Sequence, residues 1–499
     1  MKKRANYYLF ISFAAAIFFI SCKKENPCLG CGSTGSGGNG GSANKPPVAH
    51  AGSHQFITLP TDSVLLSGST SSDPDGTITS FSWTKTSGPS SFTIVNPNAE
   101  QTWAKQLIPG IYTFELTVKD NGGLSAKASI AITVYPSFCN IENRPQVAAQ
   151  LIAVNNLSIA RGSMTIASAG NKILYAGGYT GSASSGWQFY SRVDIFDINT
   201  NTWTTSELSQ ARWGMATAVL GNKIFFAGGV SAVGTYTTRV DIYDAAANTW
   251  SASELSSGGT EITGAAAGDK VLFAGGVRGL VSYSKIVDIY DNSTGTWSTT
   301  SLNRPGDAVG MTATVIENKI YFAGDASDWW AWDFGTISST INIYDAVTNT
   351  WATSDMTMPR GYLAGIAVGN KNYWAGGLYQ QPQTNSGPFT NLVEIRDMST
   401  GTPSFGCLFQ PNAFFSAVEK TNKIVFFTSG IGNSPSSWQE IPRVLNKFDI
   451  YDITTGSWSI GVLPVNIYGS NIISVNNTIY VAGGYVNDAL SSQVWKLEF

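Results

Sequence analysis

The residues of this chain best suited to bind a ligand are aromatic rings and guanidinium groups in its expected loops. The tryptophans are Trp187, Trp213, Trp329, Trp330, Trp332 and Trp438, and the arginines are Arg161, Arg212, Arg304 and Arg360. Tryptophan rings in loops suit stacking on the flat faces of sugars or anchoring a protein partner. A ring of guanidinium groups would favour carboxylates or acidic sugars, because each can form two parallel hydrogen bonds.

The densest aromatic patch is the stretch 325–334, which contains three of these tryptophans among aspartates. This stretch could present the rings to a ligand. It could equally pack on itself or on a neighbouring domain, and the sequence leaves both alternatives open.

Histidine usage excludes several kinds of chemistry. The two histidines, His50 and His54, both precede residue 147, so the long C-terminal region has none. That region therefore lacks a Ser/His/Asp triad and a His-ligated metal, and we expect no metal and no cofactor. The net charge of −3 is too small and of the wrong sign to attract nucleic acid.

The elements that must position the candidate residues repeat about every 50 residues. In the clearest copy, Asn222–Gly229 is an apolar run ending in Gly-Gly, Val240–Asp244 is a second strand, and Trp250 lies on a third. The small-residue run Gly214–Leu220 before them suits an innermost strand. The apolar runs end at Gly178, Gly229, Gly276, Asp325, Gly377, Gly430 and Gly484. Each repeat therefore predicts four strands, a to d.

Gly-Gly, the strand-c aromatic and the strand-d tryptophan recur in the order that resembles kelch β-propellers. The resemblance implies a seven-bladed propeller over 147–499. Kelch repeats often carry arginine between strands d and a for structural reasons, so the four arginines have that alternative role. The absence of histidine from 147–499 also argues against the copper oxidases that share this fold, because their metal site needs histidines.

The two ends of the propeller are expected to meet in one blade. The last repeat stops at Phe499, after its strand c, and 151–161 aligns with 202–212. Residues 150–158 should therefore lie beside Val494–Glu498, with Ile152 in the place of Trp203. Such closure removes open sheet edges.

Loop lengths indicate which face of the propeller binds. The turns between strands a and b and between c and d are short, whereas the b–c loops 179–192, 325–340, 378–392 and 431–447 are long and dissimilar. The b–c and d–a connections of a propeller share one face, and binding residues concentrate on variable loops. The repeated aspartates that end strand c, such as Asp244 and Asp345, we interpret as turn formers.

Residues 46–135 predict a separate β-domain of short strands, the size of an immunoglobulin-like sandwich. The residues Ser72–Gly76, Trp83 and Gly110–Gly123 follow the order of a PKD-type domain, which they resemble. The resemblance implies a spacer or adhesion module. Asp73 and Asp75 could bind calcium, although turn formation is the alternative. The fold class is thus all-β: an immunoglobulin-like PKD β-sandwich followed by a seven-bladed kelch β-propeller closed by an N-terminal strand.

The N-terminus predicts export and anchoring. Residues 1–21 have a basic start and a short apolar run, and Ser21-Cys22 ends a stretch that resembles a bacterial lipoprotein box. Acylation of Cys22 would anchor the chain in the cell envelope, most simply in the outer membrane. Residues 22–45 are a Gly/Ser-rich tether and 136–146 a linker.

Four cysteines remain if Cys22 is acylated, and an oxidising compartment would pair them. Cys28 and Cys31 suit a small local disulfide within the tether. That leaves Cys139 with Cys407, a bond that would fasten the linker to the propeller.

Together these features predict a monomeric, lipid-anchored binding or adhesion protein. Its partner would be a glycan or an extracellular or periplasmic protein, held by the b–c/d–a face. The alternative is a kelch-type carbohydrate-active enzyme that uses Glu/Asp and Arg without histidine. No pair of carboxylates has a spacing that identifies its catalytic groups.

Overall fold

The structure, a computed structural model, describes residues 44–135, 141, 143–182, 185–278, 282–303, 308–325, 337–379, 389–413, 415–427 and 446–499. All regular elements of these residues are β-strands, so the all-β prediction is confirmed for them. In this part of the chain there is no helix long and apolar enough to span a bilayer.

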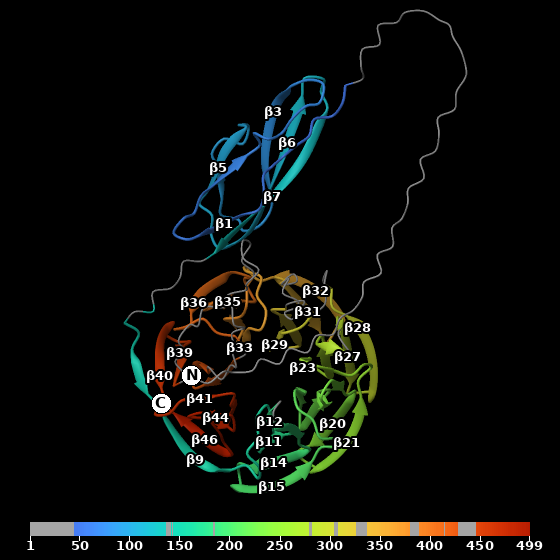
Figure 1. Cartoon of the computed structure of the whole chain (residues 1–499), viewed down its shortest axis with the longest axis vertical. Helices are drawn as coiled ribbons and strands as arrows, with labels where there is room; N and C mark the ends of the chain where they lie inside the picture. Colours follow the sequence, from blue (N-terminus) through green and yellow to red (C-terminus); the bar gives the residue numbers. More distant parts are fainter. Residues whose placement is uncertain are drawn as a thin grey trace, which may run out of the picture.

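The N-terminal strands form two sheets with a shared core (Figure 1). One sheet has the order β1 (Gln55–Thr58), β7 (Ser125–Tyr135), β6 (Gly110–Asp120) and β3 (Ile78–Ser87); the other has β2 (Val64–Ser67), β5 (Gln101–Lys105) and β4 (Thr93–Ile94). Alternate residues of β6, from Tyr112 to Val118, are fully buried against Trp83. This alternation is the reason that the segment forms a half-buried strand.

Seven further sheets, which we call blades 1 to 7, stand around a common centre in Figure 1. Each has strands a, b, c and d in that order. Strands a are β10 (Thr165–Ala169), β16 (Ala216–Leu220), β23 (Thr263–Ala267), β29 (Thr312–Ile316), β33 (Ala364–Val368), β37 (Ser416–Lys420) and β42 (Asn471–Val475). Strands b are β11 (Lys172–Ala176), β17 (Lys223–Ala227), β24 (Lys270–Ala274), β30 (Lys319–Ala323), β34 (Lys371–Ala375), β38 (Lys423–Phe427) and β43 (Thr478–Ala482).

The outer strands complete each blade. Strands c are β14 (Arg192–Asp197), β20 (Arg239–Asp244), β27 (Ile286–Asp291), β31 (Thr340–Asp345), β35 (Leu392–Asp397), β39 (Lys447–Asp452) and β46 (Gln493–Glu498). Strands d are β15 (Thr202–Glu207), β21 (Thr249–Glu254), β28 (Thr296–Ser301), β32 (Thr350–Asp355), β36 (Pro403–Cys407), β40 (Ser457–Val462) and, in blade 7, β9 (Gln150–Asn156).

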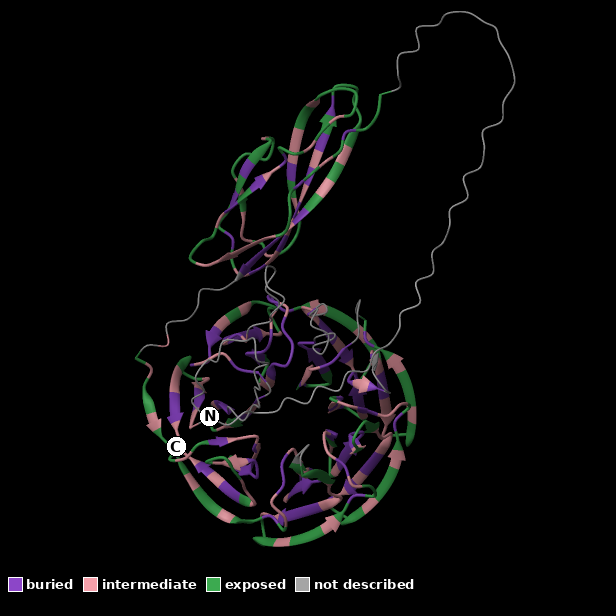
Figure 2. Cartoon of the chain, viewed as in Figure 1, coloured by how far each residue is buried: buried purple, intermediate pink, exposed green. Residues whose placement is uncertain are grey.

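The blades pack side by side, and their innermost strands follow one another in a cycle. Strand β10 contacts β16, the contacts continue through β23, β29, β33 and β37 to β42, and β42 contacts β10 again. The cores lie between neighbours: Leu174 and Val193 of blade 1 pack against Phe226 and Tyr243 of blade 2. Figure 2 shows the inner strands largely buried and the outermost ones largely exposed.

The N-terminal strand lies where the sequence predicts it, but one register detail is wrong. Strand β9 pairs antiparallel with β46, and Leu497 lies opposite Leu151. Leu497 is the counterpart of Phe196, which lies opposite Trp203 in blade 1. Leu151 therefore takes the place of Trp203, and Ile152 is instead 48% exposed. The reason is a register shift between Val494 and Trp495 that adds one residue to β9.

A second N-terminal strand fastens the preceding blade. Strand β8 (Gln146–Ala148) pairs parallel with β40, which makes blade 6 a five-stranded sheet. The segment from residue 146 to 156 thus covers the outer edges of blades 6 and 7. Covering such edges removes backbone groups that could pair with another chain.

Candidate ligand-binding face

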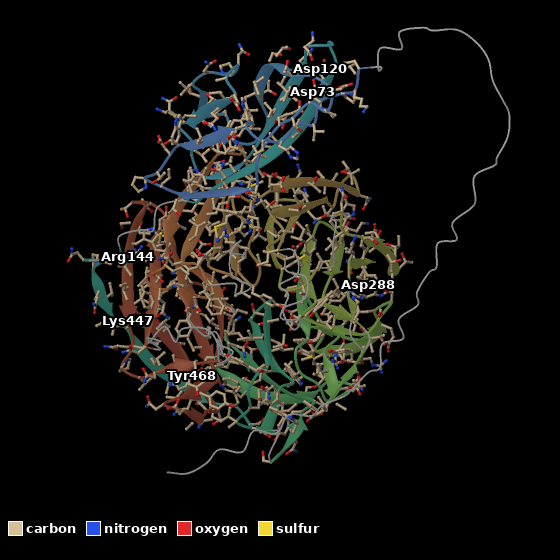
Figure 3. The ribbon with its side chains drawn as sticks, turned by 45° about the horizontal axis from the view of Figure 1, so that its top comes forward. Asp73, Asp120, Arg144, Asp288, Lys447 and Tyr468 are labelled. Atoms are coloured by element: carbon tan, nitrogen blue, oxygen red, sulfur yellow. The ribbon has the colours of Figure 1, made fainter. Side chains whose placement is uncertain are left out.

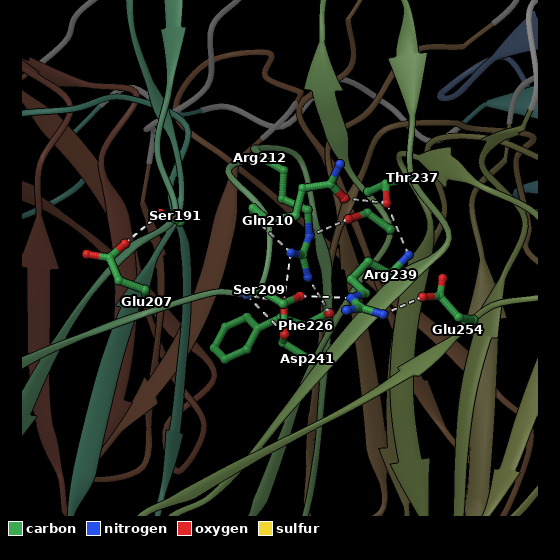
Figure 4. Close-up of polar contacts among 11 residues, drawn as sticks. Ser191, Glu207, Ser209, Gln210, Arg212, Phe226, Thr237, Arg239, Asp241 and Glu254 are labelled. Atoms are coloured by element: carbon green, nitrogen blue, oxygen red, sulfur yellow. Dashed lines mark hydrogen bonds and ion pairs between the residues drawn. The ribbon is translucent and has the colours of Figure 1, made fainter.

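Arg212 shows what the repeated arginines do. Its side chain is fully buried; Nε donates to the carbonyl of Gly228 (2.9 Å) and Nη2 to that of Phe226 (3.1 Å). Nη1 donates to the carbonyl of Gln210 and forms an ion pair of 2.8 Å with buried Asp241 (Figure 4). The chain leaves the hydrogen-bonded sheet near these carbonyls, so they lack donors from a neighbouring strand. The planar guanidinium supplies those donors.

Arg161 and Arg360 occupy the equivalent places in blades 1 and 5. Both are fully buried; Arg161 pairs with Asp194 at 2.8 Å, and Arg360 pairs with Glu394 at 3.6 Å. Burial lowers the pKa of Arg360 to about 10, which leaves it charged at neutral pH. Protein atoms surround all three guanidinium groups, which favours the structural alternative for Arg161, Arg212 and Arg360 over ligand binding. Arg304, the fourth candidate, lies outside the described residues.

In blade 3 the equivalent guanidinium comes from an arginine in another loop, which the sequence did not predict. Its residue equivalent to Arg212 is Gly259, and the guanidinium comes instead from Arg278 in the b–c loop. Arg278 pairs with Asp288 at 2.7 Å, and its Nε and Nη2 donate to the carbonyls of Gly275 and Phe273. A Cβ at Gly259 would lie 2.8 Å from Cγ of Arg278, so the glycine leaves room for it.

In blade 6 the equivalent acid, Asp449, pairs with an arginine of the N-terminal segment. Arg144 Nη1 lies 2.9 Å from the Asp449 carboxylate, and Nη2 donates to the carbonyl of Cys407 (2.7 Å). The Arg144 guanidinium also lies 5.1 Å from the centre of the Trp458 ring. Burial raises the pKa of Asp449 to about 7, against the opposing effect of the Phe409 amide and Arg144. Figure 3 shows Arg144 at the outer edge of the blades.

Two of the candidate tryptophans lie together on the loop face. Trp187, 42% exposed, is in β13 (Gly186–Phe189), which pairs with β12 (Tyr179–Ser182) in the b–c loop of blade 1. The Tyr179 ring lies 5.0 Å from Trp187 and 5.1 Å from Trp213, edge-on to both. Trp213 belongs to the connection between blades 1 and 2. Tyr179 thus joins the two, a role that the sequence analysis did not assign.

Backbone pairing holds these rings in place. Trp213 and Val230 exchange hydrogen bonds of 3.2 and 2.8 Å, and Tyr179 does the same with Gly162 at 3.0 Å. Val230 begins β18 (Val230–Ala232), part of the blade 2 loop. The three rings, which we call the Trp187 cluster, therefore rest on hydrogen-bonded strands. Rings fixed in this way lose little conformational entropy when a ligand stacks on them.

The remaining candidates fall partly outside the described residues. Trp329, Trp330, Trp332 and Trp438 lie there, as do Cys22, Cys28, Cys31 and Cys139. Cys407 is disulfide-bonded, and its partner is not among the described residues, so its pairing with Cys139 stays a prediction. Within the described part of the chain no three His, Cys, Asp or Glu residues are grouped to hold a metal ion.

A cavity of about 600 Å³ separates the N-terminal sandwich from blades 4 and 5. Sandwich loops 87–90 and 108–111 line one side, and Met356, Arg396 and Pro403 contribute to the other. The described lining has no aromatic side chain, so it offers no stacking platform comparable with the Trp187 cluster.

Comparison with known proteins supports two modules. Residues 51–134 match the "K319L-like, PKD domain" family, and residues 160–206 match the "Kelch motif" family. The predicted presence of a PKD domain and a kelch motif is therefore confirmed. Together the two modules suggest a binding or adhesion role.

Three curated relatives each match a limited part of this chain. Dyslexia-associated protein KIAA0319-like protein of Mus musculus is 38% identical over 105 residues, 21% of this chain and 10% of that protein. Low-density lipoprotein receptor-related protein 11 of Mus musculus is 39% identical over 94 residues, 19% of each chain. Kelch-like protein 40a of Danio rerio is 25% identical over 154 residues, 30% of this chain and 24% of that protein. This chain thus spans between a tenth and a quarter of the length of these animal relatives, to which it is similar through single modules.

Proposed function

We propose that this chain is a binding or adhesion protein that engages a glycan through the b–c/d–a face of a seven-bladed kelch propeller. The match to the kelch motif and the cyclic order of seven four-stranded sheets support that architecture. The PKD-type sandwich acts as a spacer. Acylated Cys22 anchors a monomer in the bacterial cell envelope, at the outer membrane, and the Gly/Ser-rich tether holds it away from the lipid.

The observation that carries the glycan proposal is the Trp187 cluster. Trp187 is 42% exposed although it is a large aromatic residue, and its ring is held edge-on to Tyr179. A sugar ring has an apolar face that stacks on such a surface while its hydroxyls stay in water. The other proposed function, capture of a protein partner, would use the same rings as anchors.

A glycan array with the purified full chain tests this proposal. Trp187→Ala should reduce the signal for the bound glycans by about tenfold, because truncating an anchoring aromatic side chain costs more than about 1 kcal/mol and about 1.4 kcal/mol corresponds to tenfold in affinity. Trp103→Ala is the matched control, since Trp103 is 45% exposed but lies in β5 of the sandwich. It should leave the signal unchanged.

Two results would contradict the proposal. Equal glycan binding by the Trp187→Ala and unaltered chains would remove the cluster from the site. Absence of glycan binding by the unaltered chain, together with capture of an envelope protein that depends on Trp187, would favour the protein partner. A change in the glycan's mass or anomeric ratio during incubation would instead favour the enzyme.

A further inference from the structure

One backbone position recurs at the inner rim of the loop face. Two residues before strand a, the backbone is left-handed in six blades, and residue 414, its equivalent in blade 6, lies outside the described residues. The φ angles are 49° at Ser163, 66° at Gly214, 55° at Glu261, 67° at Gly310, 57° at Tyr362 and 63° at Gly469. Glycine adopts this conformation without strain, and three blades use it.

Among the described residues at this position, Glu261 and Tyr362 have the two large side chains. A left-handed conformation strains residues that have a Cβ, and such strain persists where a site uses the side chain. Neither residue is required by the ring itself, because Gly214 and Gly310 form the same turn. The two side chains therefore have a reason to be there other than the turn.

The two side chains meet each other. Tyr362 Oη donates a hydrogen bond of 3.2 Å to the Glu261 carboxylate, which joins blade 5 to blade 3. The Tyr362 ring passes over Gly310 of blade 4, where an added Cβ would lie 2.6 to 2.8 Å from it. Gly310 thus leaves the space through which Tyr362 reaches Glu261. The hydrogen bond from Tyr362 fixes the direction of the Glu261 carboxylate.

The surroundings of Tyr362 are apolar. Tyr362 packs in a cluster with Val309, Ile337, Leu378 and Ala413, and Tyr283 and Phe389 lie against that cluster. Glu261 itself stays open to solvent on one side. Burial on its other sides raises the pKa of its carboxyl group. Among the ion pairs of the described residues none includes Glu261, so its charge has no basic partner there.

Glu261 follows a residue that is hydrogen-bonded to the backbone next to Trp213. Thr260, the residue before Glu261, donates a hydrogen bond of 3.1 Å from Oγ1 to the carbonyl of Gly214. Gly214 directly follows Trp213, one of the three rings of the cluster. The connection that carries Trp213 and the one that carries Glu261 are thus neighbours, and within the described residues the Glu261 carboxylate has no basic partner.

We propose that Glu261, oriented by Tyr362, binds the primary ammonium group of an amino sugar whose ring stacks on the Trp187 cluster. A partly desolvated carboxylate gains most from a ligand that carries a positive charge, since a cation offsets its lost hydration. Tyr362 is a positioning residue. This inference rests on the proposed function, because it names the sugar class for the same face.

Isothermal titration of the full chain with two matched oligosaccharides tests the inference. One is an oligomer of glucosamine, and the other is the same oligomer with every amine acetylated. The measurement is made at a pH at which the free amines of the glucosamine oligomer are protonated. The unaltered chain should bind the cationic oligomer about tenfold or more tightly than the acetylated one, as expected for a charge-assisted hydrogen bond.

Two variants assign that preference to the pair. Glu261→Gln keeps the shape and the acceptor for Tyr362 but removes the charge, so it should bind both oligomers with similar affinity. Tyr362→Phe should reduce the preference without abolishing it, because it frees the carboxylate to turn. Unchanged thermal unfolding midpoints would show that both variants are folded.

The inference is overturned if the unaltered chain shows no preference for the cationic oligomer, or if Glu261→Gln keeps that preference. In either case, loss of binding in Trp187→Ala would leave the glycan function standing. Failure of the unaltered chain to bind either oligomer overturns this inference, and the glycan array decides separately whether the wider function also fails.

Discussion

Replacement of Arg212 by alanine tests whether the repeated arginines hold the ring together. The change removes a fully buried guanidinium that serves the carbonyls of Gly228 and Phe226 and the carboxylate of Asp241. Asp241 is only 3% exposed, so its charge would remain buried without its partner. We expect Arg212→Ala to destabilise the ring strongly.

The expected magnitude follows from burial. Breaking a buried ion pair by removing one partner costs about 3–5 kcal/mol, since an uncompensated charge is left behind. Arg239 is the matched control. It is the first residue of strand β20 and pairs with Glu254 at 2.7 Å, and the two side chains are 38% and 50% exposed. Such a surface pair contributes about 0.2–1 kcal/mol, so Arg239→Ala should change stability little.

Urea unfolding followed by tryptophan fluorescence measures the difference. The midpoint of Arg212→Ala should fall by on the order of 1 M, and that of Arg239→Ala should barely move. The double variant Arg212→Met/Asp241→Leu should recover only the part of the loss that comes from the unpaired charge, because the carbonyls of Gly228 and Phe226 would still lack a donor. Equal midpoints for the two single variants, with glycan binding lost only in Arg212→Ala, would refute the structural role.

Three shorter predictions concern other parts of the chain. The raised pKa of Asp449 means that the folded state binds more protons than the unfolded state between about pH 4 and pH 7. Stability should therefore fall as pH rises through that window, and Asp449→Asn should flatten this dependence in thermal unfolding; an unchanged slope would contradict the assignment. Cys407→Ser should lower the free energy of unfolding by about 2–5 kcal/mol, and peptide mapping of the unaltered chain should link Cys407 to Cys139; a link to any other cysteine would disprove that pairing. Glu261→Gly should raise the thermal midpoint, because it relieves strain of about 1–3 kcal/mol, whereas Glu261→Ala should not; a lower midpoint for the glycine variant would show that the residue is there for stability.

The strands could be predicted because each repeat states the same pattern several times. The expected strand Val240–Asp244 is β20, and the small-residue run before Lys223 contains β16. The turn role of the aspartates is also confirmed: Asp345 accepts hydrogen bonds from the amides of Val347 and Thr348, which lower its pKa. Local patterns of this kind survive folding because they depend on neighbours in sequence.

The register of the closing strand could not be predicted in the same way. An alignment without gaps pairs Leu157 with Leu208, and both are indeed buried. It then assigns Ile152 to the place of Trp203, because no residue in the sequence marks the bulge that inserts one position. A bulge changes which residues face the core without changing the apolar pattern on either side of it.

The roles of the arginines depend on burial, which the sequence does not state. Arg212 comes from the connection before strand a and Arg278 from the loop between strands b and c, yet their guanidinium groups bond to equivalent carbonyls. A comparison of repeats would have found the exchange only by asking what replaces Arg212 in blade 3, where Gly259 stands. Glu261 could have been found by the same comparison, since glycine occupies its place in other blades.

The physical reason that separates scaffold from site is the supply of hydrogen-bond donors. Where strand b ends, backbone carbonyls no longer have hydrogen-bond donors from a neighbouring strand. Because these carbonyls are buried, another group of the protein must donate to them. Arg212 is suited to this because its guanidinium serves several carbonyls and an acid at once, which commits its donors to the protein. Glu261 and Trp187 satisfy no such need: a glycine forms the same turn as Glu261, and Trp187 remains 42% exposed. If binding depends on residues that the ring does not require, then Glu261→Gln and Trp187→Ala should alter binding and leave unfolding nearly unchanged. Changes at Arg212 should do the reverse.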